Sequence, residues 1–167
     1  MSGGDQARVS VAVAVPPDAA FEIFTSEIDR WWRRGPKFRW SGRNAGLLHL
    51  EPQVGGRLFE SVDSENGTGP HVFEVGRVLV WEPPTRLAFS WRNANFTPDE
   101  ITQVDVEFVP SRTGTIVTVT HRGWSALRPD HPARHGLHGA AFSRMVGLWW
   151  GELLTSLRQS CGTGGLQ

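Results

Sequence analysis

The N-terminal part of the chain predicts one β-strand followed by two short helices. Residues 8–15 alternate strictly, with four valines on one face, which is the pattern of a half-buried strand. The pair Pro16-Pro17 ends this strand, and a proline suits the first position of a helix. Apolar residues then recur at helical spacing as far as Trp32, with a capping-type Ser26 between them. We therefore expect two helices that are separated near residues 25–26.

The middle of the chain predicts six further strands and no long helix. Runs of strand-forming residues occupy positions 47–51, 57–62, 71–81, 86–91, 101–109 and 115–123. Turn-forming residues lie between the runs, as at Pro83-Pro84 and Thr113-Gly114. Such short connections favour antiparallel hairpins, because a parallel crossover needs a dozen or more residues. Together with the first strand, these runs predict a seven-stranded antiparallel sheet.

The last part of the chain predicts one long helix. Apolar residues recur every three or four positions across residues 136–158, and several glycines in the same stretch suggest close packing of this helix. The fold class is therefore α+β. No linker or repeat divides the sequence, so we expect a single domain over residues 8–160, with flexible tails at residues 1–7 and 161–167.

Alternation places two polar residues on the apolar faces of predicted strands. His121 shares a face with Val117 and Val119, so its imidazole either bonds to a backbone carbonyl or water, or binds a ligand oxygen. Glu60 lies on the same side of its strand as Leu58. An inward carboxylate at this position has to be paired or protonated.

Charge and composition exclude several classes of protein. Lysine plus arginine and aspartate plus glutamate each number 17, so the formal charge is zero and no basic excess is available for nucleic acid. Cys161 is the single cysteine and cannot form an internal disulfide, and the polar N-terminus lacks the apolar core of a signal peptide. No run approaches the roughly 18 apolar residues of a membrane span. These features predict a cytoplasmic protein.

One long motif carries a resemblance to a known family. Residues 74–91 read EVGRVLVWEPPTRLAFSW and resemble the signature of the family named after the activator of heat-shock protein 90 ATPase. Further matching pieces are residues 15–24, residues 52–57, the 115–123 strand, and Trp150, Leu154 and Leu157 in the last helix. This family belongs to the START-like superfamily, also called SRPBCC, which is related to the birch-pollen allergens. The resemblance spans nearly the whole chain.

The resemblance implies a helix-grip fold, in which a curved antiparallel sheet grips the long C-terminal helix. Relatives hold lipids, sterols, polyketides or hormones in a cavity between sheet and helix. Some relatives are cyclases or hydrolases, and others are transporters or co-chaperone domains. Unlike for the eukaryotic co-chaperone, we expect no separate N-terminal domain here. This difference argues against stimulation of a chaperone ATPase.

Aromatic rings are the main candidates for a binding site. The chain has eight tryptophans and nine phenylalanines but no tyrosine. An empty cavity of about 300 Å³ would cost on the order of 7 kcal/mol, so a ligand, water or the protein's own rings must occupy it. Planar rings suit flat apolar ligands through stacking. We predict that a ligand contacts Trp31, Trp32, Phe59, Phe73, Trp91, His121, Trp124, Phe142 and Trp149.

Three functions follow from these observations. The preferred one is a small START-like domain that binds a hydrophobic or aromatic small molecule. A polyketide cyclase-like or hydrolase-like enzyme, with His121 or Glu60 as acid or base, is an alternative. The other alternative is a co-chaperone or regulatory interaction module, in which Trp32 and Trp40 form an interface. A homodimer is a further option.

A cluster of histidines raises the question of a metal site. His131, His135 and His138 have spacings that could gather imidazoles on one helix. Pro132 and Gly136 interrupt such a helix, so we expect a structural or solvated loop. The sequence also has no nucleophile elbow, phosphate loop or dinucleotide fingerprint. We therefore predict no metal, no cofactor and no catalytic residue.

Overall fold

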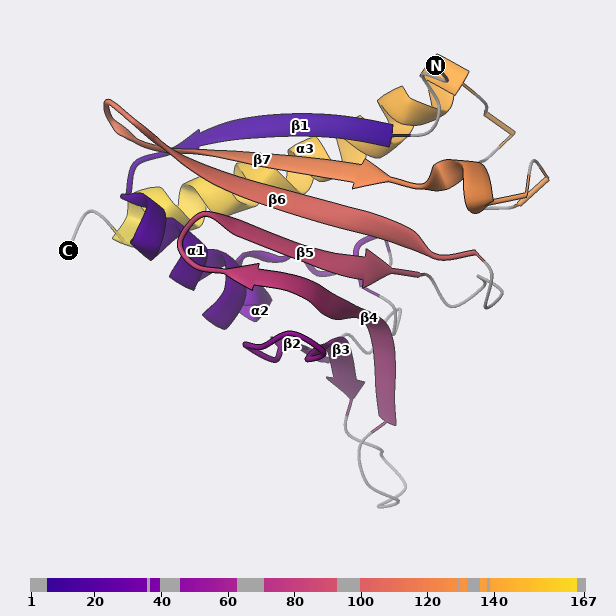
Figure 1. Cartoon of the computed structure of the whole chain (residues 1–167), viewed down its shortest axis with the longest axis horizontal. Helices are drawn as coiled ribbons and strands as arrows, with labels where there is room; N and C mark the ends of the chain where they lie inside the picture. Colours follow the sequence, from indigo (N-terminus) through magenta and orange to yellow (C-terminus); the bar gives the residue numbers. More distant parts are fainter. Residues whose placement is uncertain are drawn as a thin grey trace.

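The computed structural model describes residues 6–35, 37–39, 46–62, 71–92, 100–128, 130–131, 136–137 and 139–164. Within these residues, an antiparallel sheet curls around a long helix (Figure 1). The strands are β1 (Gln6–Val13), β2 (Leu47–Leu50), β3 (Arg57–Val62), β4 (His71–Glu82), β5 (Arg86–Trp91), β6 (Thr102–Ser111) and β7 (Gly114–Arg122). The helices are α1 (Pro17–Ser26), α2 (Ile28–Trp31), the short 3-10 helix η2 (Trp124–Ala126) and α3 (Gly139–Gly164). The predicted α+β helix-grip architecture is confirmed.

The strand order is β1-β7-β6-β5-β4-β3-β2, so strands β2 to β7 follow one another as hairpins and β1 joins β7. In Figure 1, α3 runs behind β1, β7 and β6, whereas β2, β3 and β4 extend away from it. Helices α1 and α2 lie toward the end of the sheet at which α3 terminates. The inner face of β5 is turned toward α3, because the ring of Trp91 lies 6.0 Å from that of Trp150. No helix in the described part of the chain is long and apolar enough to cross a membrane.

The long helix differs from its predicted bounds at both ends. It begins at Gly139 rather than at residue 136. Gly136 and Gly139 both have left-handed backbone angles φ, of 75° and 58°, so regular helical backbone follows only after Gly139. It continues beyond residue 158 to Gly164, because Cys161 is buried and holds the last turns against the core. The break between the two short helices falls where it was predicted, after Ser26.

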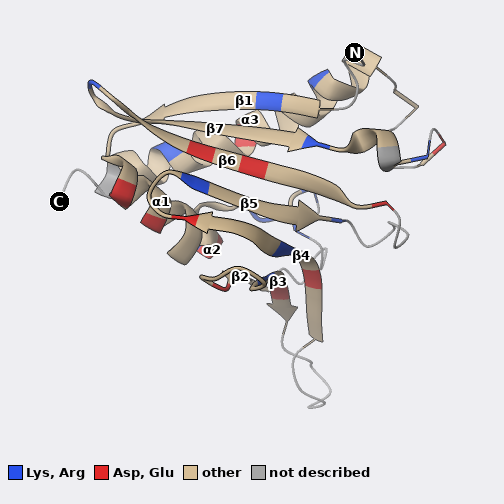
Figure 2. Cartoon of the chain, in the orientation of Figure 1, with Lys and Arg blue, Asp and Glu red and all other residues tan. Residues whose placement is uncertain are grey.

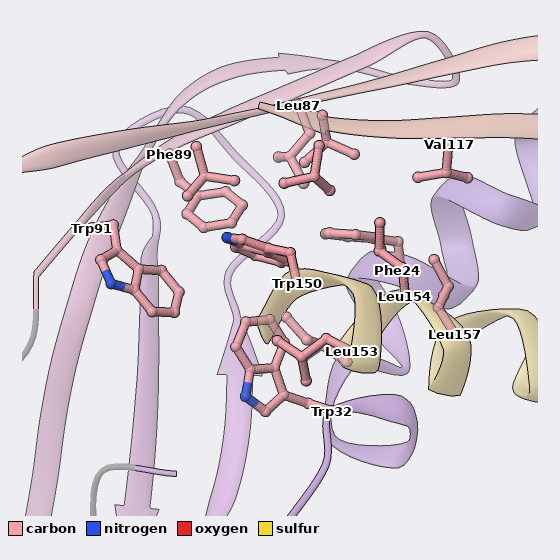
Figure 3. Close-up of a cluster of buried hydrophobic side chains, with 14 of the residues drawn as sticks. Phe24, Trp32, Leu87, Phe89, Trp91, Val117, Trp150, Leu153, Leu154 and Leu157 are labelled. Atoms are coloured by element: carbon pink, nitrogen blue, oxygen red, sulfur yellow. The ribbon is translucent and has the colours of Figure 1, made fainter. Parts of the chain in front are cut away.

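The two faces of the sheet differ in chemistry. On the outer face, Asp105 of β6 accepts from Arg122 at 2.7 Å and from Arg86 at 3.4 Å, across three neighbouring strands (Figure 2). On the inner face, buried apolar residues of β5, β6 and β7 lie opposite one another, as in the pair Phe108 and Val117. Leu154 and Leu157 of α3 lie near Val117 on this inner face in Figure 3 and are buried.

Strand β4 departs from simple alternation. Its pairing with β3 shifts at Leu58 and Phe59, and its pairing with β5 shifts between Val78 and Val80. As a result, Val75 and Val78 are both buried, although residues three positions apart would face opposite sides of a regular strand. Irregular pairing of this kind bends a strand, and β4 turns away from the plane of β5 to β7 in Figure 1.

Candidate functional site

Four tryptophans from three parts of the chain meet between the sheet and the helices. Trp32 directly follows α2, Trp91 ends β5, and Trp149 and Trp150 are consecutive in α3. The centroids of these rings lie between 5.2 and 6.0 Å apart in every pairwise combination. Most pairs are tilted or edge-to-face, which is the favourable geometry for aromatic rings. We call these four residues the tryptophan cluster.

Further rings extend this cluster on both sides. Trp31 contacts Trp32 at a centroid distance of 5.4 Å. At the other end, His121 lies 4.4 Å from Trp124, and Trp124 lies 5.0 Å from Phe142. Seven of the nine predicted ligand contacts therefore belong to one connected set of rings, namely Trp31, Trp32, Trp91, His121, Trp124, Phe142 and Trp149.

The tryptophan cluster reaches the surface at one member. Trp32, Trp91 and Trp150 are buried, whereas Trp149 is only partly buried. The indole N–H of Trp149 donates to the carbonyl oxygen of Lys37 at 2.9 Å. Figure 3 shows Trp150 extending from α3 toward the sheet, with Phe89 and Trp91 on the sheet side. The buried space between the sheet and α3 is thus filled by aromatic rings, and Trp149 is the member of the cluster that reaches the solvent.

The His121 side chain is buried and both of its ring nitrogens are engaged. The indole N–H of Trp150 donates to Nδ1 at 3.0 Å, so Nε2 carries the hydrogen and donates to Thr102 Oγ1 at 2.7 Å. The Thr102 hydroxyl in turn donates to the Trp91 carbonyl oxygen at 3.2 Å. Burial lowers the pKa of His121 to about 3. His121 is therefore a neutral residue that orients Trp150.

Glu60 points inward, as alternation predicts, and is buried. Its Oε2 accepts a hydrogen bond from the Gly46 N–H at 2.8 Å. Phe73 lies directly opposite Glu60 on β4 and is partly buried against the core. This part of the inner face therefore carries one carboxylate and one ring next to the start of β2.

Arg39 and Asp29 hold the segment between α2 and β2 in place. Four of the hydrogen bonds of the buried Arg39 guanidinium go to backbone oxygens, and one goes to Asp29 Oδ1 at 2.8 Å. Asp29 Oδ1 also accepts from the Leu48 N–H at 2.8 Å. Burial alone would raise the pKa of the Asp29 carboxyl. The Leu48 and Arg39 hydrogen bonds, with the charges of Arg39 and Arg34, instead hold it below its ordinary value of 3.8.

Two predicted residues lie elsewhere than expected. Phe59 does not face the ring set, because Leu58 and Glu60 on either side of it point inward and a strand alternates. Its ring stacks on His49 at 4.9 Å and lies 4.5 Å from the Arg57 guanidinium, on the opposite face. The prediction that Trp32 and Trp40 form an exposed interface is wrong for Trp32, because Trp32 is buried inside the tryptophan cluster. Trp40 lies outside the described residues.

The histidine cluster offers no metal site within the described chain. His131 is buried, with Nε2 3.7 Å from Oε1 of Glu100. His135 and His138 lie outside the described residues. No group of three or more potential ligands gathers in the part of the chain that the structure describes.

Several residues of the site escaped the sequence analysis. Asp29, Lys37 and Arg39 lie in or beside a stretch with no periodicity. Glu152, whose Oε1 lies 2.8 Å from Lys37 Nζ, falls on the polar face of a helix. The excess of basic residues over positions 30–43 marks this segment, but it does not show which of the charged side chains are buried or paired. Trp150 did carry a signal, since helical spacing places it on the apolar side of α3.

Comparisons with known proteins agree with this architecture. The family described as "Activator of Hsp90 ATPase homolog 1-like protein" matches residues 14–158. No curated protein matches the chain.

Solved structures share the fold at low sequence identity. A protein from Nitrosomonas europaea is 15% identical, with complete coverage of both chains and a TM-score of 0.64. An HSP90 activator from Plasmodium falciparum is 18% identical over 95% of this chain and 97% of its own, with a TM-score of 0.61. DynU16, a putative protein in the dynemicin biosynthetic locus, is 22% identical over 96% of this chain and 48% of its own, with a TM-score of 0.62. At these identities the likeness concerns the fold.

Proposed function

Because the chain belongs to the family of activator of Hsp90 ATPase homolog 1-like proteins, we propose that this START-like domain binds a hydrophobic or aromatic small molecule at its tryptophan cluster. The observation that carries this proposal is the partly exposed ring of Trp149, which contacts three buried tryptophans. A ligand that stacks on Trp149 would contact an apolar surface that extends from the solvent to the buried tryptophans between the sheet and α3. Planar apolar molecules gain most from such a surface.

Binding involves movement of Trp149. The rings are in contact with one another, so a ligand makes room by turning one of them, which then stacks on the ligand instead of on its neighbours. Trp149 is the least costly ring to turn, because part of its surface already faces water and its one hydrogen bond goes to the Lys37 carbonyl. Trp150 is held by its bond to His121 and stays in place as the floor of the site.

The enzyme alternative has less support. DynU16 shares the fold and is associated with a biosynthetic locus. His121, however, donates and accepts within the protein through both ring nitrogens, and its pKa of about 3 keeps it unprotonated near neutral pH. An acid–base reaction would therefore depend on Glu60. The co-chaperone alternative rests on the fold shared with the Plasmodium falciparum activator, because Trp32 provides no exposed interface.

Fluorescence titration with the uncharged probe N-phenyl-1-naphthylamine tests the proposal. We expect saturable binding to the wild-type protein and a loss of affinity of about tenfold in Trp149→Ala. The matched control is Leu148→Ala, because Leu148 is the adjacent residue of α3 and is 65% exposed. No binding to the wild type, or equal binding by both variants, would overturn the proposal. Native mass spectrometry of the purified protein checks for a retained apolar ligand.

A further inference from the structure

Basic residues are concentrated beside the tryptophan cluster. Residues 30–43 contain six arginines and lysines and no acidic residue, in a chain whose charges balance overall. Among the described residues of this segment, Arg30, Arg33, Arg34 and Lys37 have side chains that are at least half exposed. Arg39 is different, because its side chain is buried and its guanidinium bonds to Asp29 and to backbone oxygens within the protein.

Two of these cations share one carboxylate. Lys37 Nζ lies 2.8 Å from Oε1 of Glu152, and Arg33 Nη1 lies 3.6 Å from Oε2 of the same residue. Two positive charges therefore face a single negative charge on α3. Glu152 is itself partly exposed, so solvent screens both pairs and each contributes little to stability. Such pairs are readily exchanged for another anion.

The same two cations adjoin the apolar site. The Phe38 ring lies 5.3 Å from the Arg33 guanidinium and 5.4 Å from Lys37 Nζ. Phe38 stacks on Trp149 at a centroid distance of 5.7 Å and an interplanar angle of 29°. A path of rings therefore leads from the two cations through Phe38 to Trp149 and the buried tryptophans.

We propose that the ligand is an amphipathic anion: its apolar body lies on the tryptophan cluster, and its acidic group binds Arg33 and Lys37 in place of the Glu152 carboxylate. This inference rests on the proposed function and narrows its ligand class. An arginine fork and a lysine ammonium together suit a carboxylate or sulfonate, which accepts several charge-assisted hydrogen bonds. The acidic group of the ligand pairs with the two cations that the Glu152 carboxylate neutralises when no ligand is bound.

Two probes with the same aromatic body distinguish the contribution of the charge to binding from that of the ring contacts. 8-Anilino-1-naphthalenesulfonate carries one sulfonate, and N-phenyl-1-naphthylamine lacks it. We expect the wild-type protein to prefer the sulfonate. In Arg33→Gln combined with Lys37→Gln, the affinity for the sulfonate should fall about tenfold while binding of the uncharged probe is unchanged. Added salt should weaken the binding of the sulfonate probe and leave the binding of the uncharged probe unchanged.

Two further variants distinguish a site from a general effect of charge. Arg30→Gln removes an exposed arginine of the same segment whose partner is Glu27, and should leave both probes unaffected. Glu152→Gln removes the competing carboxylate and should tighten sulfonate binding severalfold, an outcome that a merely structural role of the pair does not produce. Competition by dodecanoate and by 2-naphthoate then shows whether an aliphatic or an aromatic acid fits better.

The two proposals fail in different ways. If neither probe binds, the proposed function fails. If both probes bind with equal affinity, or if Arg30→Gln weakens the sulfonate as much as the double variant does, the anion site is wrong and the apolar site stands. Weaker sulfonate binding in Glu152→Gln would also overturn the anion site.

Discussion

The guanidinium of Arg39 is fully buried against the partly exposed carboxylate of Asp29, and the two residues join three separate parts of the chain. Asp29 belongs to α2, Arg39 lies in the segment that follows, and both bond to the start of β2 through Gly46 or Leu48. The neighbouring Gly46 N–H bonds to Glu60. This ion pair therefore helps to position α2 and the start of β2, and with them Trp32 and Glu60.

Arg39→Lys should lower the free energy of unfolding by about 2–4 kcal/mol. A lysine keeps the charge but cannot reproduce five donors in a planar fork, so several buried backbone oxygens lose their partners. Urea unfolding measures the change. The control is Arg34→Lys, which contacts the same carboxylate from an exposed position and should cost less than about 1 kcal/mol. Equal effects of the two substitutions would contradict this role for Arg39.

The stability should depend on the ionisation of Asp29 in acid. Because the folded pKa of this carboxyl is below 3.8, its contribution is fully present above pH 3.8 and is lost as the pH falls through the folded value. Asp29→Asn should be less stable than the wild type at pH 7, and the difference should shrink below pH 3.8. Chemical unfolding of both proteins across this range tests the trend. A constant difference would show that Asp29 is not the titrating group.

His121 should affect stability in a higher pH window. Its pKa is about 3 in the folded protein and about 6.5 when exposed, so the unfolded chain binds a proton that the folded chain excludes. Stability should therefore fall as the pH decreases from 6.5 toward 3, by up to about 1.4 kcal/mol per pH unit. His121→Gln keeps the other five histidines and should show a shallower slope. Parallel slopes for variant and wild type would contradict the assignment.

Trp150→Ala should destabilise the protein much more than Trp149→Ala. Removing the buried Trp150 leaves a cavity and deprives His121 Nδ1 of its donor, at a cost of about 3–5 kcal/mol. Trp149 is partly exposed, so its loss should cost roughly 1–2 kcal/mol. Thermal and urea unfolding of the two variants give the comparison. The reverse order would mean that the ring set is held together from the surface rather than from its centre.

The pattern of apolar and polar residues was enough to predict the order of strands and helices along the chain and the inward-facing residues of β5, β6 and β7. Those features follow from periodicity, which is local: Leu87, Phe89 and Trp91 alternate with residues on the opposite face, and His121 follows the same rule on β7. The family resemblance added the helix-grip architecture, which the pairing of the strands confirms.

Which side chains contact one another depends on the folded arrangement of the chain. Trp32, Trp91 and Trp149 are far apart in the chain, and nothing in their spacing predicts ring contacts within 6.0 Å. The irregular pairing of β4 and the bonds of Arg39 likewise depend on where distant backbone segments lie. Periodicity reports which face of an element is buried, but the partner of a buried polar group or ring is set by distances that exist only after folding.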